Sequence, residues 1–278
     1  MIVLTQVPFV ATLVISLMRW NALYPEDRAF AGLDNFRLVV QNAALRSSVA
    51  TTLILTLVVV GVSLVLGLIL ALLLNRRFAG RGMVRTMLIA PFLLVPVASA
   101  LIWKHVLLNT SYGLINGVLN WVWSLFGSSA APQPAWVSEY PLISIEAGLI
   151  WQWTPFMMLI ILAGLQSLPP DTVEAAHIDG AGGVDVFRYI TFPHLRRYLE
   201  LGALLGGIYI VQNFDAVFTI TQGGLGTSNL PYTIYRTFFQ AQDYGLASAM
   251  GVVVVVGTIV IATFALRVVS SLFREGTR

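Results

Sequence analysis

The sequence of 278 residues contains no cysteine and few charged residues. The absence of cysteine excludes disulfide bonds and any chemistry that depends on a thiolate. Charged residues make up only 10% of the chain, whereas a soluble domain carries about 25%. Hydrophobic residues make up 57%, and the mean hydropathy is +0.82. These values predict an all-α membrane protein, a polytopic bundle of helices.

Signals of nucleotide and metal chemistry are also missing from the sequence. No GxxxxGK[ST] segment is present to bind the phosphates of ATP. The three histidines, His105, His177 and His194, do not have the spacing of metal ligands. We therefore expect no catalytic residue, no metal site and no bound cofactor in this chain. The net charge of +3 does not indicate nucleic acid binding, because the basic residues lie in short loops between apolar segments.

The apolar segments predict about six transmembrane helices, since a span needs about 20 residues. The first, residues 1–20, is short and has no basic residue before it, so we expect a start upstream or a trimmed helix. The other five form a core over residues 48–272, and residues 1–278 form a single domain. Pro91 and Pro96 predict a kinked or broken third span. The expected core spans are Val49–Leu74, Thr86–Leu107, Pro141–Leu165, Tyr198–Ile220 and Tyr244–Val269.

The connections between the spans differ in character. The segment AGLDNF, residues 31–36, is expected to form a short interfacial helix. The loop over residues 109–140 carries aromatic residues that are typical of a membrane interface, namely Trp121, Trp123, Trp136 and Tyr140.

The distribution of basic residues predicts the orientation. With six spans, the loop after the second span, the segment before the fifth span and the C-terminal tail lie on one side. That side holds ten of the sixteen Lys and Arg residues, so the positive-inside rule places it in the cytoplasm. The ten are Arg76, Arg77, Arg81, Arg85, Arg188, Arg196, Arg197, Arg267, Arg274 and Arg278.

The segment 168–197, here called the coupling segment, is too polar to lie in lipid but has strong local signals. Asp171 and Glu174 match a capping box that opens a short helix, TVEAAHID, which ends at Gly180. A second short helix, DVFRYI, is expected to end at Pro193. Several apolar residues would be left exposed, which indicates a partner site, although an amphipathic loop on the membrane surface is the alternative. They are Val173, Ala176, Ile178, Val186, Phe187 and Ile190.

Glu174-Ala175-Ala176, Gly180 and, after nine intervening residues, Ile190-Thr-Phe-Pro193 resemble the EAA loop of ABC importer permeases. Phe192 stands where that family more often has leucine. The resemblance implies a type I importer fold of the carbohydrate class and a cytoplasmic coupling helix that docks on an ATPase subunit. The residues that it assigns to this contact are Glu174, Ala175, Ala176, Asp179, Gly180, Ile190 and Pro193.

The fifth span carries the candidate substrate residues. Gly202, Gly206, Tyr209 and Asn213 fall on one face of the predicted helix, and a hydroxyl and an amide suit uncharged polyhydroxyl ligands. Gln212 and Asp215 are rotated away from this face, and packing between helices is the alternative for all of these polar groups. In the fourth span, Gln152 and the aromatic residues Trp151, Trp153 and Phe156 are further candidates.

The resemblance to sugar permeases indicates which of these residues contact the substrate. It places the ligand between the two spans that flank the coupling segment and implies contacts from Trp153, Phe156, Gly206, Tyr209, Ile210 and Asn213. To these we add Gln212, which belongs to a Gln212-Asn213-Phe214 segment typical of carbohydrate permeases. Leu225 departs from the proline that is common in the following Gly-rich turn.

The implied assembly contains two permease subunits, usually different, two cytoplasmic ATPase subunits that bind ATP and magnesium, and an extracytoplasmic solute-binding protein. It would import a neutral sugar, disaccharide or polyol across the cytoplasmic membrane of a prokaryote by alternating access. A secondary transporter and a structural membrane subunit are the alternatives. Asp215 and Glu146 are candidates for the ion relay of a secondary transporter, but they lie near the ends of their spans.

Overall fold

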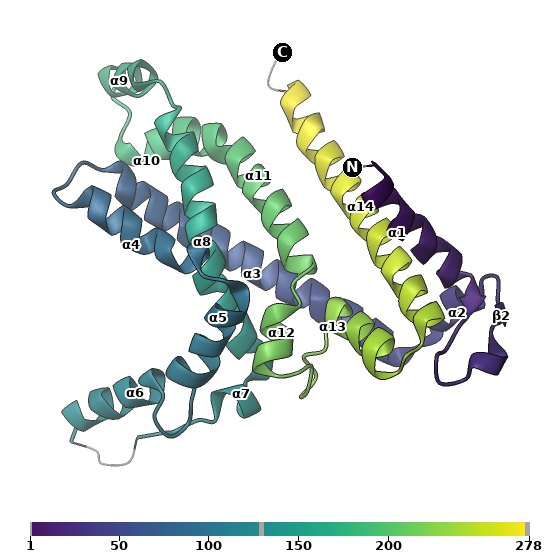
Figure 1. Ribbon diagram of the computed structural model, residues 1–278. Coiled ribbons are helices and arrows are strands. Elements are labelled where there is room, and N and C mark those ends of the chain that lie inside the picture. The colour runs from purple at the N-terminus through teal and green to yellow at the C-terminus, as the bar shows by residue number, and fades with distance from the viewer. Residues whose placement is uncertain (1, 128–130, 276–278) are drawn as a thin grey trace. The chain divides into compact units, whose positions relative to one another are not determined.

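The computed structural model describes residues 2–127 and 131–275, and its secondary structure is dominated by helices (Figure 1). The helices are α1 (Ile2–Ser16), α2 (Asp34–Gln41), α3 (Ala43–Asn75), α4 (Arg81–Leu93), α5 (Pro96–Leu101), α6 (Leu114–Leu125), α7 (Trp136–Glu139), α8 (Pro141–Gln166), α9 (Pro170–Ile178), α10 (Gly183–Val186), α11 (Phe192–Val211), α12 (Asp215–Ile220), α13 (Leu230–Tyr235) and α14 (Tyr244–Glu275).

The chain also forms shorter helical turns and one small hairpin. A 3-10 turn, η1 (Pro25–Asp27), and three π-helical turns, η2 (Ile102–Leu107), η3 (Phe187–Thr191) and η4 (Arg236–Gln240), are present. Strands β1 (Met18–Arg19) and β2 (Ala29–Phe30) pair antiparallel, with Met18 opposite Phe30. This small hairpin was not predicted. Of the helix expected over residues 31–36, only the second half is helical, because α2 begins at Asp34 and continues to Gln41, and its place at the membrane interface stays a prediction.

Within the described residues, two helices are long and apolar enough to cross a membrane, α3 and α8. The pair α4 and α5 with η2 gives a third span if the bent pair is counted as one. The all-helical, membrane-spanning character is therefore confirmed. The first predicted span forms the 15-residue helix α1. Two further apolar helical stretches, Gln6–Ser16 of α1 and Tyr244–Ile259 of α14, lie among the residues whose side chains are described, and α14 as a whole has 32 residues.

The third span is broken, as its prolines predict. The chain bends by 96° between α4 and the segment Pro96–Leu107, which comprises α5 and η2. The break falls at Leu94 and Val95, whose extended backbone ends α4 and precedes Pro96, the first residue of α5. Pro91 remains inside α4. Pro96 marks the break because a proline disfavours the helical conformation of the residue before it and fits the first position of a new helix.

The expectation of one continuous fifth helix over Tyr198–Ile220 is wrong. Helix α11 ends at Val211 and α12 begins at Asp215. Inside this break, the backbone carbonyl of Asn213 accepts a hydrogen bond from Nδ2 of Asn229, at 2.5 Å. A long-range side chain thus satisfies a backbone group that the interrupted helix leaves without its usual partner.

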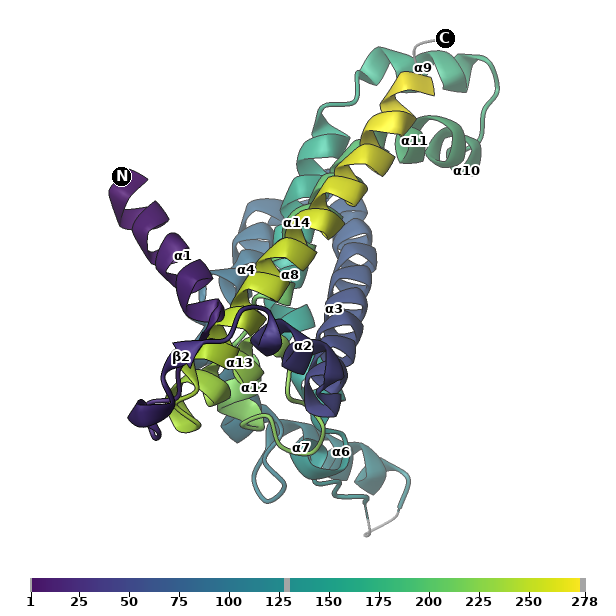
Figure 2. The same ribbon diagram turned by 90° about the vertical axis from the view of Figure 1, so that its right-hand side faces the viewer.

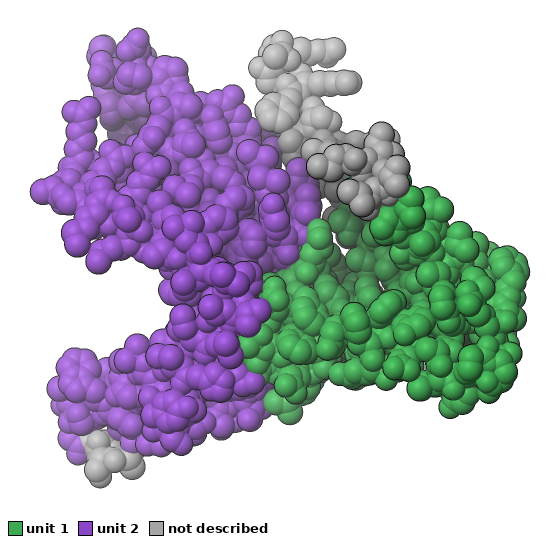
Figure 3. All heavy atoms as spheres, viewed as in Figure 1, with its two compact units in different colours: residues 1–54, 211–268 green, residues 55–210, 269–278 purple. Residues whose placement is uncertain are grey.

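The described chain divides into two compact units, which Figure 3 colours separately. Unit 1 contains residues 1–54 and 211–268, and unit 2 contains residues 55–210 and 269–278. In unit 1, buried hydroxyl groups tie the start of α3 to the region of α13. Ser48 Oγ lies 2.7 Å from Thr233 Oγ1, and Thr52 Oγ1 accepts from the N–H of Leu230 at 2.9 Å. The predicted single domain remains a prediction.

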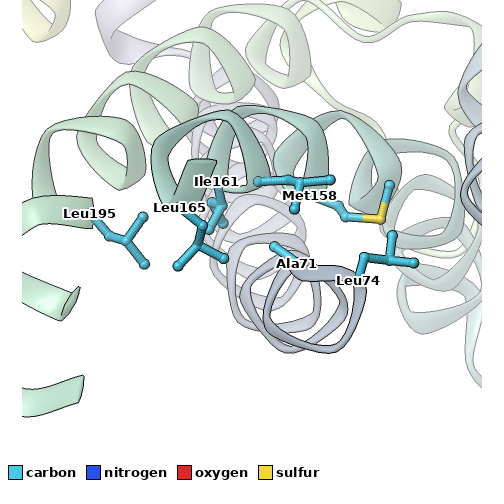
Figure 4. Packing of buried hydrophobic residues seen from close by; sticks show 7 residues of the cluster. Ala71, Leu74, Met158, Ile161, Leu165 and Leu195 are labelled. Carbon is cyan, nitrogen blue, oxygen red and sulfur yellow. The ribbon is translucent and has the colours of Figure 1, made fainter. Parts of the chain in front are cut away.

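The core of unit 2 lies where α3, α8 and α11 pack together. Figure 4 shows Ala71 and Leu74 of α3 facing residues of α8, with Leu195 contributed by α11. The buried members are Ala71, Leu74, Met158, Ile161, Leu162, Leu165 and Leu195. Glycines bring the helices close, since a Cβ atom on Gly202 would stand 3.1 Å from a methyl carbon of Leu64. These contacts fix the two helices that flank the coupling segment.

Candidate functional site

The coupling segment projects from one end of unit 2. In both views, α9 and α10 lie at the opposite end of this unit from α6 and α7 (Figures 1 and 2). Helix α9 begins at Pro170 and uses Pro169 as its N-cap, without a side-chain hydrogen bond. The predicted capping box at Asp171 and Glu174 is therefore wrong. Pro170 suits the first helical position. Asp171 lies in the first turn, where its negative charge interacts favourably with the helix dipole.

The end of α9 at Gly180 is confirmed. Gly180 has φ of +88°, a left-handed conformation that side chains disfavour. Its N–H donates to the carbonyl of His177 at 3.1 Å, and the N–H of Ala181 donates to the carbonyl of Ala176 at 2.9 Å. These two bonds form a Schellman motif, which satisfies the last carbonyls of α9 and turns the chain back.

The second predicted helix does not end at Pro193. The chain continues from α10 through η3 into α11, and Pro193 is the second residue of α11. In the π-helical turn, the N–H of Phe192 donates to the carbonyl of Phe187, five residues earlier. Pro193 comes directly after this turn, at the start of α11, where a missing N–H costs least.

The coupling segment exposes apolar residues, as expected for a partner site. Ile178 is 86% exposed and Val184 is 79% exposed, while Tyr189 is also exposed. Val186, which was expected at this surface, is buried. Of the residues assigned to the ATPase contact, Glu174, Ala175, Asp179, Gly180 and Pro193 are exposed, and Ala176 and Ile190 are half-buried. Glu174 is exposed and forms no ion pair with another described residue.

The aromatic candidates on α8 and α11 form one cluster in unit 2. The rings of Trp153 and Tyr209 lie 5.3 Å apart, and those of Trp153 and Phe156 lie 5.6 Å apart. Phe92 of α4 extends the cluster, with its ring 5.2 Å from that of Phe156. Trp153 and Phe156 are half-buried, and Tyr209 is 57% exposed. The cluster therefore presents aromatic faces and one phenolic hydroxyl at an accessible position.

Other predicted substrate residues are packed in the interior of unit 2. Ile210 is fully buried, and Gly206 lies against the methyl group of Met157. The close approach at Gly206 serves helix packing, and a ligand contact by Gly206 or Ile210 stays a prediction.

Asn213 and Gln212 lie in unit 1, in the break between α11 and α12. The Oδ1 atom of Asn213 accepts from the N–H of Ala216 at 3.3 Å, so its carbonyl group caps the start of α12. Gln212, the residue before Asn213, is exposed. The predicted face that continues from Gly206 to Asn213 is interrupted, because α11 ends two residues before Asn213.

Sequence reasoning did not find the role of Gln152. Its Nε2 group donates to the carbonyl of Leu94 at 3.1 Å, within the break between α4 and α5. The broken helix deprives this carbonyl of its regular partner, and the buried amide replaces that partner. Glu146 is also buried on α8, and its Oε1 has no hydrogen-bond partner among the described residues. No cluster of metal-ligating side chains occurs in the described part of the chain.

Comparisons with known proteins agree with this arrangement. The family described as "Binding-protein-dependent transport system inner membrane component" matches residues 63–274. A probable ABC transporter permease protein, y4oQ of Sinorhizobium fredii, is 36% identical over 94% of this chain and 84% of its own length. The trehalose/maltose transport system permease protein MalF of Thermococcus litoralis is 34% identical over 88% of this chain and 81% of its own length.

A solved structure has the same fold. A chain of a bacterial alginate ABC transporter, crystallised with an alginate pentasaccharide-bound periplasmic protein, has a TM-score of 0.79 at 21% identity. The match covers 95% of this chain and 88% of that chain. The chain described here belongs to the family of binding-protein-dependent transport system inner membrane components, as an ABC transporter permease of the prokaryotic inner membrane.

Proposed function

We propose that this chain is the translocation subunit of an ATP-driven importer for a neutral sugar, disaccharide or polyol. Relatives that act on trehalose and maltose, by their names, support the carbohydrate class. The structural observation that carries the proposal is the pair of Trp153 and Tyr209, whose ring centroids lie 5.3 Å apart with an interplanar angle of 34°. An accessible phenol beside an indole suits a sugar, because it offers an aromatic face together with a hydroxyl group.

The chemistry of this pair fits a polyhydroxyl ligand. Aromatic faces contact the C–H faces of sugar rings, and the hydroxyl of Tyr209 both donates and accepts hydrogen bonds. Polar groups in a membrane helix normally face a cavity or the interior of a bundle. No lysine or arginine occurs among the proposed substrate residues, so a neutral ligand is favoured over an anionic one.

ATP hydrolysis belongs to a separate subunit in this proposal. The sequence lacks a phosphate-binding glycine loop, and ATP and magnesium bind to that partner. The assembly contains a second, different permease subunit, two cytoplasmic ATPase subunits and an extracytoplasmic binding protein. A relative in fold was crystallised with its periplasmic protein, which supports the last partner. The exposed apolar residues around α9, with Glu174, Asp179 and Gly180, contact the ATPase subunit.

Transport proceeds by alternating access. ATP binding draws the ATPase subunits together, and α9 transmits that motion to the helices on either side of it. A partner can shift the equilibrium between two conformations only if it binds one of them with a more favourable free energy than the other. The energetic role of this chain is therefore to change conformation when α9 is displaced, and to change the accessibility of the sugar site as it does so.

The experiment measures ATP hydrolysis by the complete assembly in lipid discs, with a panel of neutral sugars and polyols and the binding protein. Stimulation by one loaded binding protein is expected. Uptake by Tyr209→Phe should then show an apparent affinity about fivefold weaker, as expected for one hydrogen bond of about 1 kcal/mol. Tyr112→Phe is the matched control, because Tyr112 is an exposed residue outside the cluster. Uptake that is driven by an ion gradient and needs no ATPase subunit would overturn the proposal.

A further inference from the structure

A hydrogen-bonded cluster joins the two ends of the coupling segment in unit 2. Ser167 follows the last residue of α8, whereas His194 and Tyr198 lie in the first two turns of α11. Ser167 Oγ is 3.0 Å from His194 Nε2 and 2.7 Å from the hydroxyl oxygen of Tyr198. We call these three residues the Ser167 clasp. It connects two points of the chain that are separated by the whole of α9, α10 and η3.

The directions of the hydrogen bonds follow from what each atom can do. Ser167 Oγ donates to the carbonyl of Gly164 at 2.9 Å, and His194 Nε2 lies 3.1 Å from the same oxygen. Since a carbonyl can only accept, His194 must carry its hydrogen on Nε2. Arg197 Nη2 donates to the hydroxyl of Tyr198 at 3.3 Å, which directs the hydrogen of that hydroxyl toward Ser167. The network is therefore consistent from Arg197 to Gly164.

Close packing also holds the clasp in place. A Cβ atom on Gly164 would stand 2.5 Å from Cδ2 of Tyr198 and 3.0 Å from Cδ2 of Leu195. The ring of Tyr198 thus lies directly against the backbone of α8, at a position that only glycine allows. Leu165 and Leu195, the chain neighbours of Gly164 and His194, belong to the buried core (Figure 4). The clasp is therefore attached to the buried core of unit 2.

We propose that Ser167, His194 and Tyr198 are positioning residues for energy coupling. They hold the ends of the coupling segment together, so that a displacement of α9 moves α8 and α11 as one body. This inference rests on the proposed function, because it requires an ATPase subunit that moves α9. Helix α8 carries Trp153 and Phe156, and α11 carries Tyr209. The clasp therefore connects the ATPase contact with the proposed sugar contacts through both helices at once.

The coupling segment contains two irregular turns, and these explain why a clasp at its ends matters. The turn at Gly180 and the π-helical turn η3 are both places where the backbone departs from a regular α-helix. A push on α9 could be absorbed there if the ends of the segment were free to spread. With the ends joined, the lowest-energy response is a movement of both helices, because separating them would break the clasp and expose the core beneath it.

The test measures sugar uptake and ATP hydrolysis in the same preparation of vesicles that contain the complete assembly and its binding protein. Ser167→Ala, His194→Ala and Tyr198→Phe are expected to retain stimulated ATP hydrolysis but to lose severalfold in sugar taken up per ATP. His194→Gln should restore the ratio, since the glutamine Nε2 group can donate to the carbonyl of Gly164. Ser124→Ala is the matched control, because the hydroxyl of Ser124 donates to the carbonyl of Trp121 in its own helix, at 2.7 Å, far from the coupling segment in sequence.

The outcomes separate this inference from the proposed function. An absence of stimulated ATP hydrolysis in the unmodified assembly would overturn the proposed function itself. Normal stimulation together with an unchanged uptake per ATP in Tyr198→Phe would overturn the clasp. That variant removes a single hydroxyl group and keeps the ring against Gly164, so it decides the question even if the alanine variants do not assemble. A lowered ratio in Tyr198→Phe that Ser124→Ala does not share would support the clasp.

Discussion

Gly67 of α3 lies so close to Met157 of α8 that a Cβ atom at position 67 would stand 2.8 Å from the Cβ atom of Met157. The same atom would stand 2.8 Å from the backbone nitrogen of Met158. Two helices of unit 2 therefore meet backbone to backbone at this point. Helices in membranes commonly associate through small residues of this kind, because lipid provides no hydrophobic drive for their packing.

This contact predicts that Gly67→Ala destabilises the protein by about 1–3 kcal/mol, the usual cost of an overpacked core. The backbone of Met158 cannot move aside as a side chain can, so the helices must separate. Thermal unfolding of the purified protein in lipid discs measures the effect. Gly61→Ala, on the same helix with no atom within 4 Å of its added Cβ, should leave the midpoint unchanged or slightly raised. Equal midpoints for both variants would contradict the prediction.

Gln152→Leu is expected to destabilise the break in the third span by about 1–3 kcal/mol, the cost of an unsatisfied buried polar group. The substitution keeps the approximate volume but removes the donor to the carbonyl of Leu94. Faster proteolysis near Leu94, together with a lower unfolding midpoint, would show the effect. Gln166→Leu, at an exposed position at the end of the same helix, is the control. Identical proteolysis patterns for both variants would show that Leu94 finds another donor.

Apolar runs and prolines predict much of this fold, because they act locally. The runs at 49–74 and 141–165 lie within α3 and α8. Pro96 marks the break in the third span, since a proline constrains the residue before it wherever it occurs. Gly180 marks the end of α9 for the same kind of reason, namely that a left-handed residue is needed there. These features could be predicted from the sequence because each depends on a few neighbouring residues, and the structure confirms them.

The break in the fifth span could not be predicted in the same way. No proline or glycine lies at Gln212, Asn213 or Phe214, and the hydrogen bond that supports the break comes from Asn229. The Ser167 clasp likewise depends on contacts across the coupling segment, and sequence spacing does not reveal them. The predicted capping box is wrong because α9 begins at Pro170, before Asp171. The predicted helix end at Pro193 is wrong because the π-helical turn carries the helical backbone past this proline. The substrate and ATPase contacts remain predictions.

Asn229 in unit 1 predicts how the break affects transport. Its Oδ1 accepts from the N–H of Tyr232 at 3.1 Å, and its Nδ2 donates to the carbonyl of Asn213. Asn229→Asp keeps the acceptor but replaces the donor by an oxygen that repels this carbonyl. Since Asn229 is fully buried, we expect a loss of about 1–3 kcal/mol in stability and a lower rate of sugar uptake.

Sugar uptake and the unfolding midpoint check this prediction together. Asn120→Asp makes the same chemical change at an exposed position on α6, and it should alter neither measurement. If Asn229→Asp retained normal uptake and stability, the hydrogen bond to Asn213 would not be what maintains the break.

The Schellman motif at the end of α9 predicts a local effect of Gly180→Ala. Alanine at φ of +88° costs about 1–2 kcal/mol relative to its preferred conformations. The motif then opens more often, and the N–H of Ala181, which donates to the carbonyl of Ala176, should exchange with solvent at least about fivefold faster. Hydrogen exchange followed by mass spectrometry measures this, and less ATPase subunit should co-purify with the variant.

Gly183→Ala provides the matched comparison, because Gly183 has no positive φ and no atom within 4 Å of an added Cβ. It should retain normal exchange at Ala181 and a normal amount of ATPase subunit. Since Gly180 is also open around its Cβ position, a steric clash cannot explain a difference between the two variants. A loss of ATPase subunit in Gly180→Ala alone would therefore assign the effect to the backbone conformation that ends α9. Equal retention by both variants would show that the partner does not require this turn.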